Sequence, residues 1–423
     1  MPAFRATPAL AARLPFYYGW INLALASVAM LATLPGRSVG LGLITEPMLA
    51  DLAMDRVAYG TLTFWATVIG ATFAVAVGPL IDRWGVRAVS TGVIALLAAA
   101  VVLMGNITAA GLLFLLLLIL VRGLGQSALS VVSLTIVGKW FVARLATAMG
   151  IFAVTIGIGF AAVIVLMGGQ VAEVGWRSAW TGLGWAVAVA GVLCVALVRR
   201  SPEACGLEPD SGGGERPDTG LSGYRPLAAL ATPAFWVFAI GSALYNFVIA
   251  GVTLFSESIL AEHGFDQSVF TLAMGAFMAF GLVGNLLAGW LARRHPLGRL
   301  MAVAMLLVAF SLAALPFMAA VWQAILILGG LGFSGGVVTV MFFSAFAQLF
   351  GRAHLGKIQG VAQVFAVLAS ASGPWVLARV QVTGGSYDPA FLALAPLLAV
   401  AALAAWWVPL PAPPASETTA MTE

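Results

Sequence analysis

The sequence is poor in charge. Only 9% of its 423 residues are Asp, Glu, Lys or Arg, whereas 62% are hydrophobic, and the mean hydropathy is +1.05. Soluble domains carry about 25% charged residues, so this chain has too few to cover a surface in water. The scarcity of charge predicts an integral membrane protein.

Several enzyme and cofactor classes also lack support. The two cysteines form no CxxC pair, the three histidines have no metal-ligand spacing, and no Walker phosphate loop is present. GFSGG (332–336) and GLGQSA (123–128) match nucleophile and dinucleotide patterns but lie inside apolar helical segments. We expect no enzyme activity, no metal and no cofactor. The few basic residues are scattered, which argues against nucleic acid as a partner.

Long hydrophobic runs, by contrast, are abundant. About 20 apolar residues cross a bilayer as a helix, and the sequence predicts twelve such segments. They lie near 19–45, 58–80, 88–106, 110–136, 144–168, 177–198, 233–260, 269–292, 298–319, 322–348, 357–380 and 389–410.

One long polar stretch, residues 199–226, separates the sixth segment from the seventh. Its Gly, Pro and Ser content is typical of a flexible linker. The N-terminal tail lacks the apolar core of a cleaved signal peptide. The predicted organisation is an N-terminal tail (1–16), a first six-helix bundle (17–198), a linker (199–230), a second six-helix bundle (231–410) and a disordered C-terminal tail (411–423).

The placement of Lys and Arg predicts the orientation. Of the twenty such residues, fifteen fall in loops on one side of the membrane, and only Arg56, Arg177 and Arg379 fall on the other. Arg37 and Arg122 lie within segments. By the positive-inside rule, both termini and the linker are cytoplasmic, in the inner or plasma membrane of the cell.

An internal repeat supports the division into two halves. Residues 40–55 (GLGLITEPMLADLAMD) align without gaps with residues 251–266 (GVTLFSESILAEHGFD), an offset of 211. At the same offset Gly70, Gly78 and Arg83 recur as Gly281, Gly289 and Arg294. Six helices per half give parallel repeats, which predict a substrate site between the halves near the membrane midplane.

Three motifs carry a resemblance to a known family. GPLIDRWGVR (78–87) resembles the cytoplasmic signature loop of the major facilitator superfamily. FYYGW (16–20) and KWFVARLATAMGIFAVTIGIG (139–159) are similar to the paired signatures of its monocarboxylate and oxalate:formate porter group. The resemblance implies an all-α membrane protein, with twelve transmembrane helices in two pseudo-symmetric six-helix bundles. It also implies a monomer that moves a small organic solute by alternating access.

Arg37 is the most informative single residue. It lies in the second half of the first segment, just after Pro35 and Gly36, where an unpartnered charge costs at least about 2.5 kcal/mol. Either it faces a cavity and binds substrate, or it snorkels toward the outer interface. The Pro-Gly pair favours the cavity, because interrupted backbone at membrane depth is tolerated where it lines water or is buried. The porter group often has a basic residue here.

The chain departs from the porter group in its eighth helix. Many members have a carboxylate-binding arginine where this chain has Asn285, and an aspartate where it has Gly281. Half of the carboxylate and proton machinery that the resemblance implies is therefore missing. The prediction is still a monocarboxylate or related anion, held mainly by Arg37, and the departure supports the alternative of a neutral or larger organic solute. Four further polar residues inside helices are either ligands or interhelical hydrogen-bond partners: Tyr245, Asn246, Gln126 and Gln363.

Six residues are candidates for coupling or gating. Arg122, in VRGLGQS, resembles a superfamily arginine tied to proton coupling or to helix packing. Glu46 and Glu257 are repeat-equivalent, and act in proton transfer or gating or are solvated rim carboxylates. Asp82, with Arg83 and Arg87, predicts a clamp between cytoplasmic helix ends. A co-transported proton thus remains a candidate partner beside the small-molecule substrate.

Two functional classes are compatible with these observations. One is a secondary transporter, and the other is a membrane sensor of the same fold that binds a solute without moving it. Neither the linker nor the tails contain a recognisable signalling domain, so the sequence favours transport.

Overall fold

A computed structural model describes residues 16–54, 56–207, 210 and 223–411, without the side chains of Glu46, Arg56, Val57, Gln267 and Thr271. The predicted tails lie almost wholly outside the described residues, as does Asp55 of the repeat. Within the described ranges the regular elements are helices, with one isolated bridge between Gly223 and Gly351.

Twelve helical stretches in the described part of the chain are long and apolar enough to cross a membrane, which confirms the predicted fold class. Two of them combine several elements. The first combines α2 (Gly19–Leu31) with η1 (Leu34–Gly36) and is followed directly by α3 (Ser38–Asp51), and the fourth combines α6 (Leu112–Leu120), η2 (Val121–Leu129) and α7 (Ser130–Trp140). The others are α4 (Arg56–Trp84), α5 (Val86–Gly105), α8 (Leu145–Val174), α9 (Trp176–Leu197), α11 (Pro233–Glu262), α12 (Gln267–Leu291), α13 (Leu297–Ala314, extended by η4, Leu315–Phe317), α14 (Val321–Phe350), α15 (Leu355–Gly384) and α16 (Asp388–Trp407).

Local sequence explains several helix ends. Pro233 opens α11, where its missing N–H costs nothing, and the Thr232 hydroxyl accepts a hydrogen bond from the Phe235 N–H (3.3 Å). Asp266 caps α12 by accepting the N–H groups of Ser268 and Val269, each at 3.1 Å. Between α4 and α5, Gly85 has a φ of 81°, which glycine adopts without steric cost.

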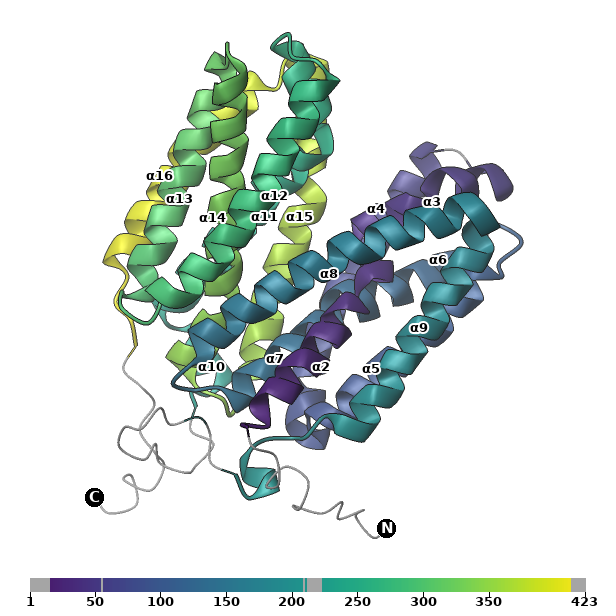
Figure 1. Ribbon diagram of the computed structural model, residues 1–423, viewed down its shortest axis with the longest axis vertical. Coiled ribbons are helices and arrows are strands. Elements are labelled where there is room, and N and C mark those ends of the chain that lie inside the picture. The colour runs from purple at the N-terminus through teal and green to yellow at the C-terminus, as the bar shows by residue number, and fades with distance from the viewer. Residues whose placement is uncertain (1–15, 55, 208–209, 211–222, 412–423) are drawn as a thin grey trace.

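The helices form two bundles (Figure 1). Helices α2 to α9, drawn purple to teal, make the N-terminal bundle, and α11 to α16, green to yellow, make the C-terminal bundle. We call the end of the molecule that holds the linker residues 199–207 and 223–232 the linker face, and the opposite end the far face. The bundles lie close together toward the linker face and diverge toward the far face.

Glycines allow the bundles to touch near the linker face. A Cβ added at Gly78 of α4 would lie 2.7 Å from the Lys357 Cα at the start of α15. A Cβ added at Gly289 of α12 would lie 2.9 Å from the Ala146 carbonyl oxygen of α8. These two glycines are repeat partners, so two equivalent crossings hold the bundles together. Both depend on backbones that approach without an intervening side chain.

The described part of the linker is attached to both bundles. Asp210 accepts hydrogen bonds from the backbone N–H groups of Val142 and Arg144, the latter at 2.9 Å. On the other side, Tyr224 N–H donates to the Phe350 carbonyl (2.8 Å) and Glu203 forms an ion pair with Arg352. The linker also contains η3 (Glu203–Cys205) and α10 (Pro226–Leu230). These contacts satisfy loop donors and acceptors that would otherwise lack partners, and the flexibility of the linker stays a prediction.

Candidate functional site

The first span is broken at Pro35 and Gly36. Helix α2 ends at Leu31, three residues form the 3-10 turn η1, and α3 starts at Ser38. Proline supplies no N–H for the helical ladder, and Arg37 has an extended backbone (φ −88°, ψ 150°). A continuous helix over 19–45 is therefore not what the chain forms. The break agrees with the interrupted backbone that the Pro-Gly pair predicts.

The fourth span contains a π-helical segment at the same place. The segment η2 (Val121–Leu129) packs directly on the break, since a Cβ added at Gly36 would lie 2.5 Å from the Val121 carbonyl oxygen and 2.6 Å from the Gln126 nitrogen. π-helical turns are rare in proteins, but those that occur often lie at functional sites. The sequence alone gave no sign of this one, because only backbone hydrogen bonding distinguishes it from an α-helix.

Arg37 projects from the break toward the middle of the membrane span. Its Nε donates to the Thr33 hydroxyl (2.7 Å), and its Nη2 lies 3.3 Å from the Met30 sulfur and 3.5 Å from the Ser130 hydroxyl. The guanidinium also lies over the Phe160 ring, 4.9 Å from its centroid. Met30 precedes Arg37 by seven residues, so the side chain runs back along the helix. This direction is opposite to snorkelling toward the far face.

Arg122 lies inside η2 and is nearly inaccessible, with 4% of its surface exposed. Its Nη1 donates to the Ser38 hydroxyl (3.0 Å) and to the Gln126 amide oxygen (3.1 Å), whereas its Nε is buried without a partner. Neither Arg122 nor Arg37 forms an ion pair with any carboxylate in the described residues. Among the described residues of the N-terminal bundle, the groups in contact with these two guanidinium groups are thus neutral.

The polar candidates of the C-terminal bundle differ in their contacts, and two of them make hydrogen bonds within the bundle. The Tyr245 hydroxyl, buried, donates to the Leu331 carbonyl of α14 (3.4 Å), and the Asn246 amide donates to Ser242 on its own helix (2.8 Å). Gln363 is half-buried on α15 and makes no hydrogen bond to the described chain. Asn285 lies where α12 packs on α14, and its amide oxygen is buried without a partner.

Asn285 and Arg37 are not brought together. A Cβ added at Gly150 of α8 would lie 3.1 Å from the Asn285 carbonyl oxygen, whereas Arg37 lies over Phe160, ten residues further along the same helix. Ten residues of helix span about 15 Å. Asn285 is therefore nearer the linker face than Arg37.

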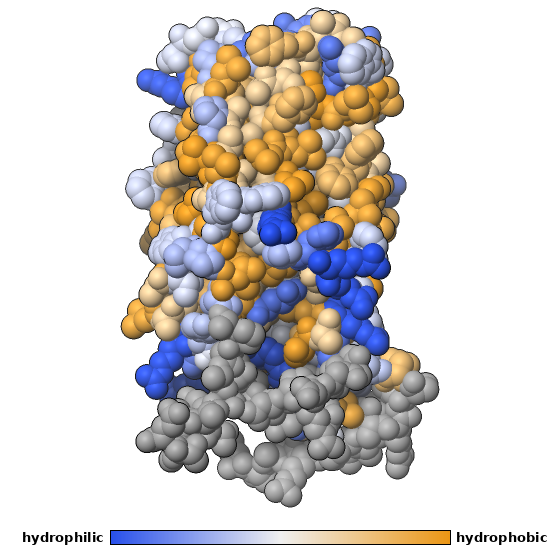
Figure 2. Space-filling view, turned by 90° about the vertical axis from the view of Figure 1, so that its left-hand side faces the viewer, coloured by the Kyte–Doolittle hydropathy of each residue, from blue (hydrophilic) through white to orange (hydrophobic). Residues whose placement is uncertain are grey.

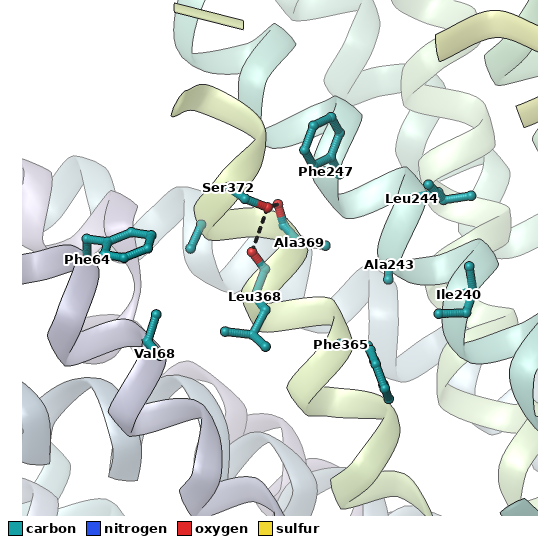
Figure 3. Close-up of a pocket in the computed structure, with 11 residues that line it drawn as sticks. Phe64, Val68, Ile240, Ala243, Leu244, Phe247, Phe365, Leu368, Ala369 and Ser372 are labelled. Atoms are coloured by element: carbon teal, nitrogen blue, oxygen red, sulfur yellow. Dashed lines mark hydrogen bonds between the residues drawn. The ribbon is translucent and has the colours of Figure 1, made fainter. Parts of the chain in front are cut away.

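An apolar pocket of about 390 Å³ lies between the bundles (Figure 3). Phe64 and Val68 point into it from α4, while Phe247 of α11 and Phe365 and Leu368 of α15 belong to the other bundle. The hydroxyl of Ser372, also in its lining, donates to the carbonyls of Leu368 and Ala369 on its own helix. The walls are therefore suited to hydrocarbon.

The pocket lies at the depth of Arg122, on the other side of α4. Gly70 of α4 packs on η2, with an added Cβ 2.9 Å from the Gly123 nitrogen. Val68 is two residues away, so it faces nearly the opposite side of the helix. One stretch of α4 therefore separates the charged break from the apolar pocket.

The Asp82 carboxylate joins the two bundles. It lies 3.1 Å from the Lys357 Nζ and 3.5 Å from the His354 Nδ1 of the C-terminal bundle. The structure does not bring Arg83 or Arg87 onto it. Arg83 is exposed, and Arg87 donates to the Val195 carbonyl (2.9 Å from Nε). An ion pair between the bundles does lie at this loop, but its cation comes from α15 and not from Arg83 or Arg87; a role as a clamp stays a prediction.

The two glutamates of the repeat lie toward the far face. Glu257 is exposed near the end of α11. Glu46 lies within α3, and its side chain is outside the described residues. Their roles in coupling stay predictions.

Twelve membrane-crossing helices in two bundles, joined by a long linker, define a class of membrane transporters. A model of the Major Facilitator Superfamily matches residues 25–374 and, in a second match, residues 254–423. The chain belongs to the Major Facilitator Superfamily. It is therefore a multi-pass membrane transporter and not an enzyme, and the resemblance stated from the loop GPLIDRWGVR is confirmed at this level.

Solved structures agree with the fold. The human organic anion transporter MFSD10 (TETRAN) is 17% identical, with a TM-score of 0.68 over 92% of this chain and 99% of that one. The proton:xylose symporter XylE, bound to 6-bromo-6-deoxy-D-glucose, is 16% identical, with a TM-score of 0.68 over 96% and 99%. At such identities the likeness shows the fold alone. No curated protein matches the sequence.

Proposed function

We propose that the protein is a secondary transporter for a small organic anion of the monocarboxylate class, which Arg37 binds. The observation that carries the proposal is the guanidinium of Arg37, held inside the N-terminal bundle by Thr33, Met30, Ser130 and Phe160 and by no carboxylate among the described residues. A cation at membrane depth is costly unless something pairs with it. An anionic substrate supplies that charge.

Within the part of the chain that the structure describes, the contacts of Arg37 come from the N-terminal bundle. Thr33 and Met30 belong to the first span, Ser130 to the fourth and Phe160 to the fifth. One side of the guanidinium is thus fixed in advance, which reduces the ordering cost of binding. In the proposed cycle the C-terminal bundle completes the site when the bundles rock around the substrate.

The proposed resting conformation is open to the outside. By the positive-inside rule the linker face is cytoplasmic, and there the bundles meet at Gly78, Gly289 and the Asp82–Lys357 ion pair. Toward the far face they diverge (Figure 1). Alternating access then requires these linker-face contacts to separate while the far ends approach.

The apolar pocket between the bundles is not part of the proposed Arg37 site, because α4 separates the two in this conformation. The proposal therefore concerns the charged group of the substrate and not its hydrocarbon part. A larger or neutral organic solute is the second candidate. The presence of Asn285, in place of the arginine of the porter group, favours it.

If transport is coupled to a proton, we propose that the proton is not carried by a carboxylate beside Arg37. The proton would use Glu46, Glu257 or the substrate itself, because Arg37 and Arg122 have neutral neighbours. We expect Glu46→Gln combined with Glu257→Gln to abolish the stimulation of uptake by outside acidification if these carboxylates carry the proton. Uptake that still responds fully to acidification in this variant would contradict the carboxylate route.

The test is transport by the purified protein, proposed to work as a monomer, in proteoliposomes. Labelled monocarboxylates, dicarboxylates and their uncharged amides are offered with and without a pH gradient. We expect uptake of a monocarboxylate, competition by other monocarboxylates and none by the matched amide. Equal competition by the amide would favour the neutral-solute candidate. Saturable binding without uptake would favour a sensor.

A further inference from the structure

A second cavity, of about 400 Å³, lies on the flank of the C-terminal bundle at its linker-face end. Its walls come from α12, α13, α14 and α16 and include Val303, Leu307 and Phe333. Arg299, His295 and Trp406 also line it. We call this cavity the flank groove. It is separate from the pocket between the bundles, with which it shares no lining residue.

The segment beside the flank groove is basic and contains no acid. Residues 291–299 read LARRHPLGR, and Arg293, Arg294 and Arg299 are exposed and form no ion pair with any described residue. Two of them lie over tryptophan rings: Arg294 over Trp290 (4.3 Å to the centroid) and Arg299 over Trp406 (5.8 Å). Trp406 holds the Arg299 guanidinium at the groove, and Arg294 adjoins His295, which lines it.

These residues lie at the level of the lipid headgroups. Arg299 is in the first turn of α13, Trp406 in the last turn of α16 and Trp290 in the last turn of α12. Tryptophan at helix ends marks the membrane–water interface. On the face that α13 and α16 present, Figure 2 shows hydrophobic side chains over much of the upper part and hydrophilic ones gathered toward the lower end.

The groove continues from that level into the hydrocarbon region. Leu307 is eight residues beyond Arg299 on α13, which is about 12 Å along the helix. Val303, halfway between them, is 54% exposed. A basic rim at headgroup depth and an apolar channel below it match the two ends of one phospholipid.

We propose that the flank groove binds an anionic phospholipid. Its phosphate lies against Arg299 and Arg294, and one acyl chain occupies the groove along Val303, Leu307 and Phe333. Anionic lipids are attracted to clusters of Arg and Lys at the membrane surface, and burial of a chain against apolar walls adds affinity that does not depend on charge. A lipid is favoured over a soluble anion because the groove extends below the headgroup level.

The test measures lipid binding to the full-length purified protein by native mass spectrometry. The probes are phosphatidylglycerol and phosphatidylcholine with identical acyl chains. We expect tighter binding of phosphatidylglycerol. Arg299→Gln should weaken it about five-fold, and Arg294→Gln with Arg299→Gln about 30-fold, from the attraction per basic residue. Arg225→Gln, an exposed arginine of the linker face away from the groove, is the matched control and should change nothing.

A second variant tests the groove apart from the charge. Val303→Trp fills it from an exposed position and leaves every arginine in place, so it should also weaken phosphatidylglycerol binding. An elution volume and Tm like those of the unaltered protein show that each variant is folded. Binding that does not distinguish the two lipids, or that survives Val303→Trp, would overturn the proposal. So would competition by soluble glycerophosphoglycerol, or a dimer that Val303→Trp disrupts.

Discussion

The two bundles share a fold but differ at their centres. At the offset of 211, Arg37 corresponds to Val248, which is 1% exposed within the uninterrupted helix α11. The fourth span shows the same contrast. GLGQS (123–127) lies in a π-helical segment, whereas the similar GLGFS (330–334) lies in the regular helix α14, with Gly329 where Arg122 would fall.

The difference shows why the two guanidinium groups lie in the N-terminal bundle. In the N-terminal bundle a break, a π-helical turn and two guanidinium groups occur together, and each supplies polar groups that the others partly satisfy. In the C-terminal bundle continuous helices satisfy their own backbone, which is the usual solution in lipid. The proposed binding of an anion therefore concerns the N-terminal bundle.

The largest effect is expected from removal of the Arg37 charge. Arg37→Ala should lower kcat/KM for the anionic substrate at least about 30-fold, because truncation of one partner of a buried charge pair costs about 2–5 kcal/mol. Arg37→Lys should retain part of the activity. Proteoliposome uptake and Tm are measured together. Unchanged kinetics in a folded Arg37→Ala protein would remove the proposed asymmetry between the bundles.

The next largest effect is expected at the two glycine crossings that are equivalent in the repeat. Gly78→Leu and Gly289→Leu each put a side chain where backbones touch, so each should hold the linker face apart and lower uptake, but by less than Arg37→Ala does. Gly92→Leu on α5, where an added Cβ meets nothing within 4 Å, is the control. Distances between spin labels at the linker-face ends of α4 and α15 should lengthen in the first two variants only. Normal distances in both would show that these crossings tolerate side chains.

A direct way to break the comparison is to give the C-terminal bundle a charge. Val248→Arg places a guanidinium in a buried, unbroken helix, at a cost of about 2.5–3.5 kcal/mol. We expect a lower Tm and lower expression, with Val248→Leu as the control for size. If Val248→Arg keeps the Tm of the unaltered protein, then the C-terminal centre can hold a cation as well as the N-terminal one does.

The smallest effect is expected at the Asp82–Lys357 ion pair. Both side chains are partly exposed (15% and 33%), and such pairs contribute up to about 1 kcal/mol. Asp82→Asn and Lys357→Gln should each shift the population away from the outward-open state by at most about five-fold. The double variant should shift it no further, as the same spin labels would report. Additive shifts would mean that the two residues act separately.

Some of the site follows from residues alone, and some does not. Arg37 after Pro35–Gly36 identifies a charged break without any coordinates, because proline cannot complete a helix and an arginine in lipid needs a partner. Asp82 is also recognisable from its loop. Its partner Lys357 is not, since it comes from a helix 275 residues later in the chain. Asn285 shows the same limit: its distance from Arg37 depends on how α8 and α12 pack.

The sequence by itself determined the membrane class, the number of spans and the division into repeats, because hydropathy is a property of each segment and the 211-residue repeat is visible along the chain. Only the tertiary structure decided which way Arg37 points, where the π-helical turn lies, and which cation meets Asp82. Those outcomes depend on contacts between distant segments, and no local pattern encodes them. The physical reason is that a bilayer selects for apolar length one helix at a time, whereas polar groups inside it are satisfied by whichever helices pack against them.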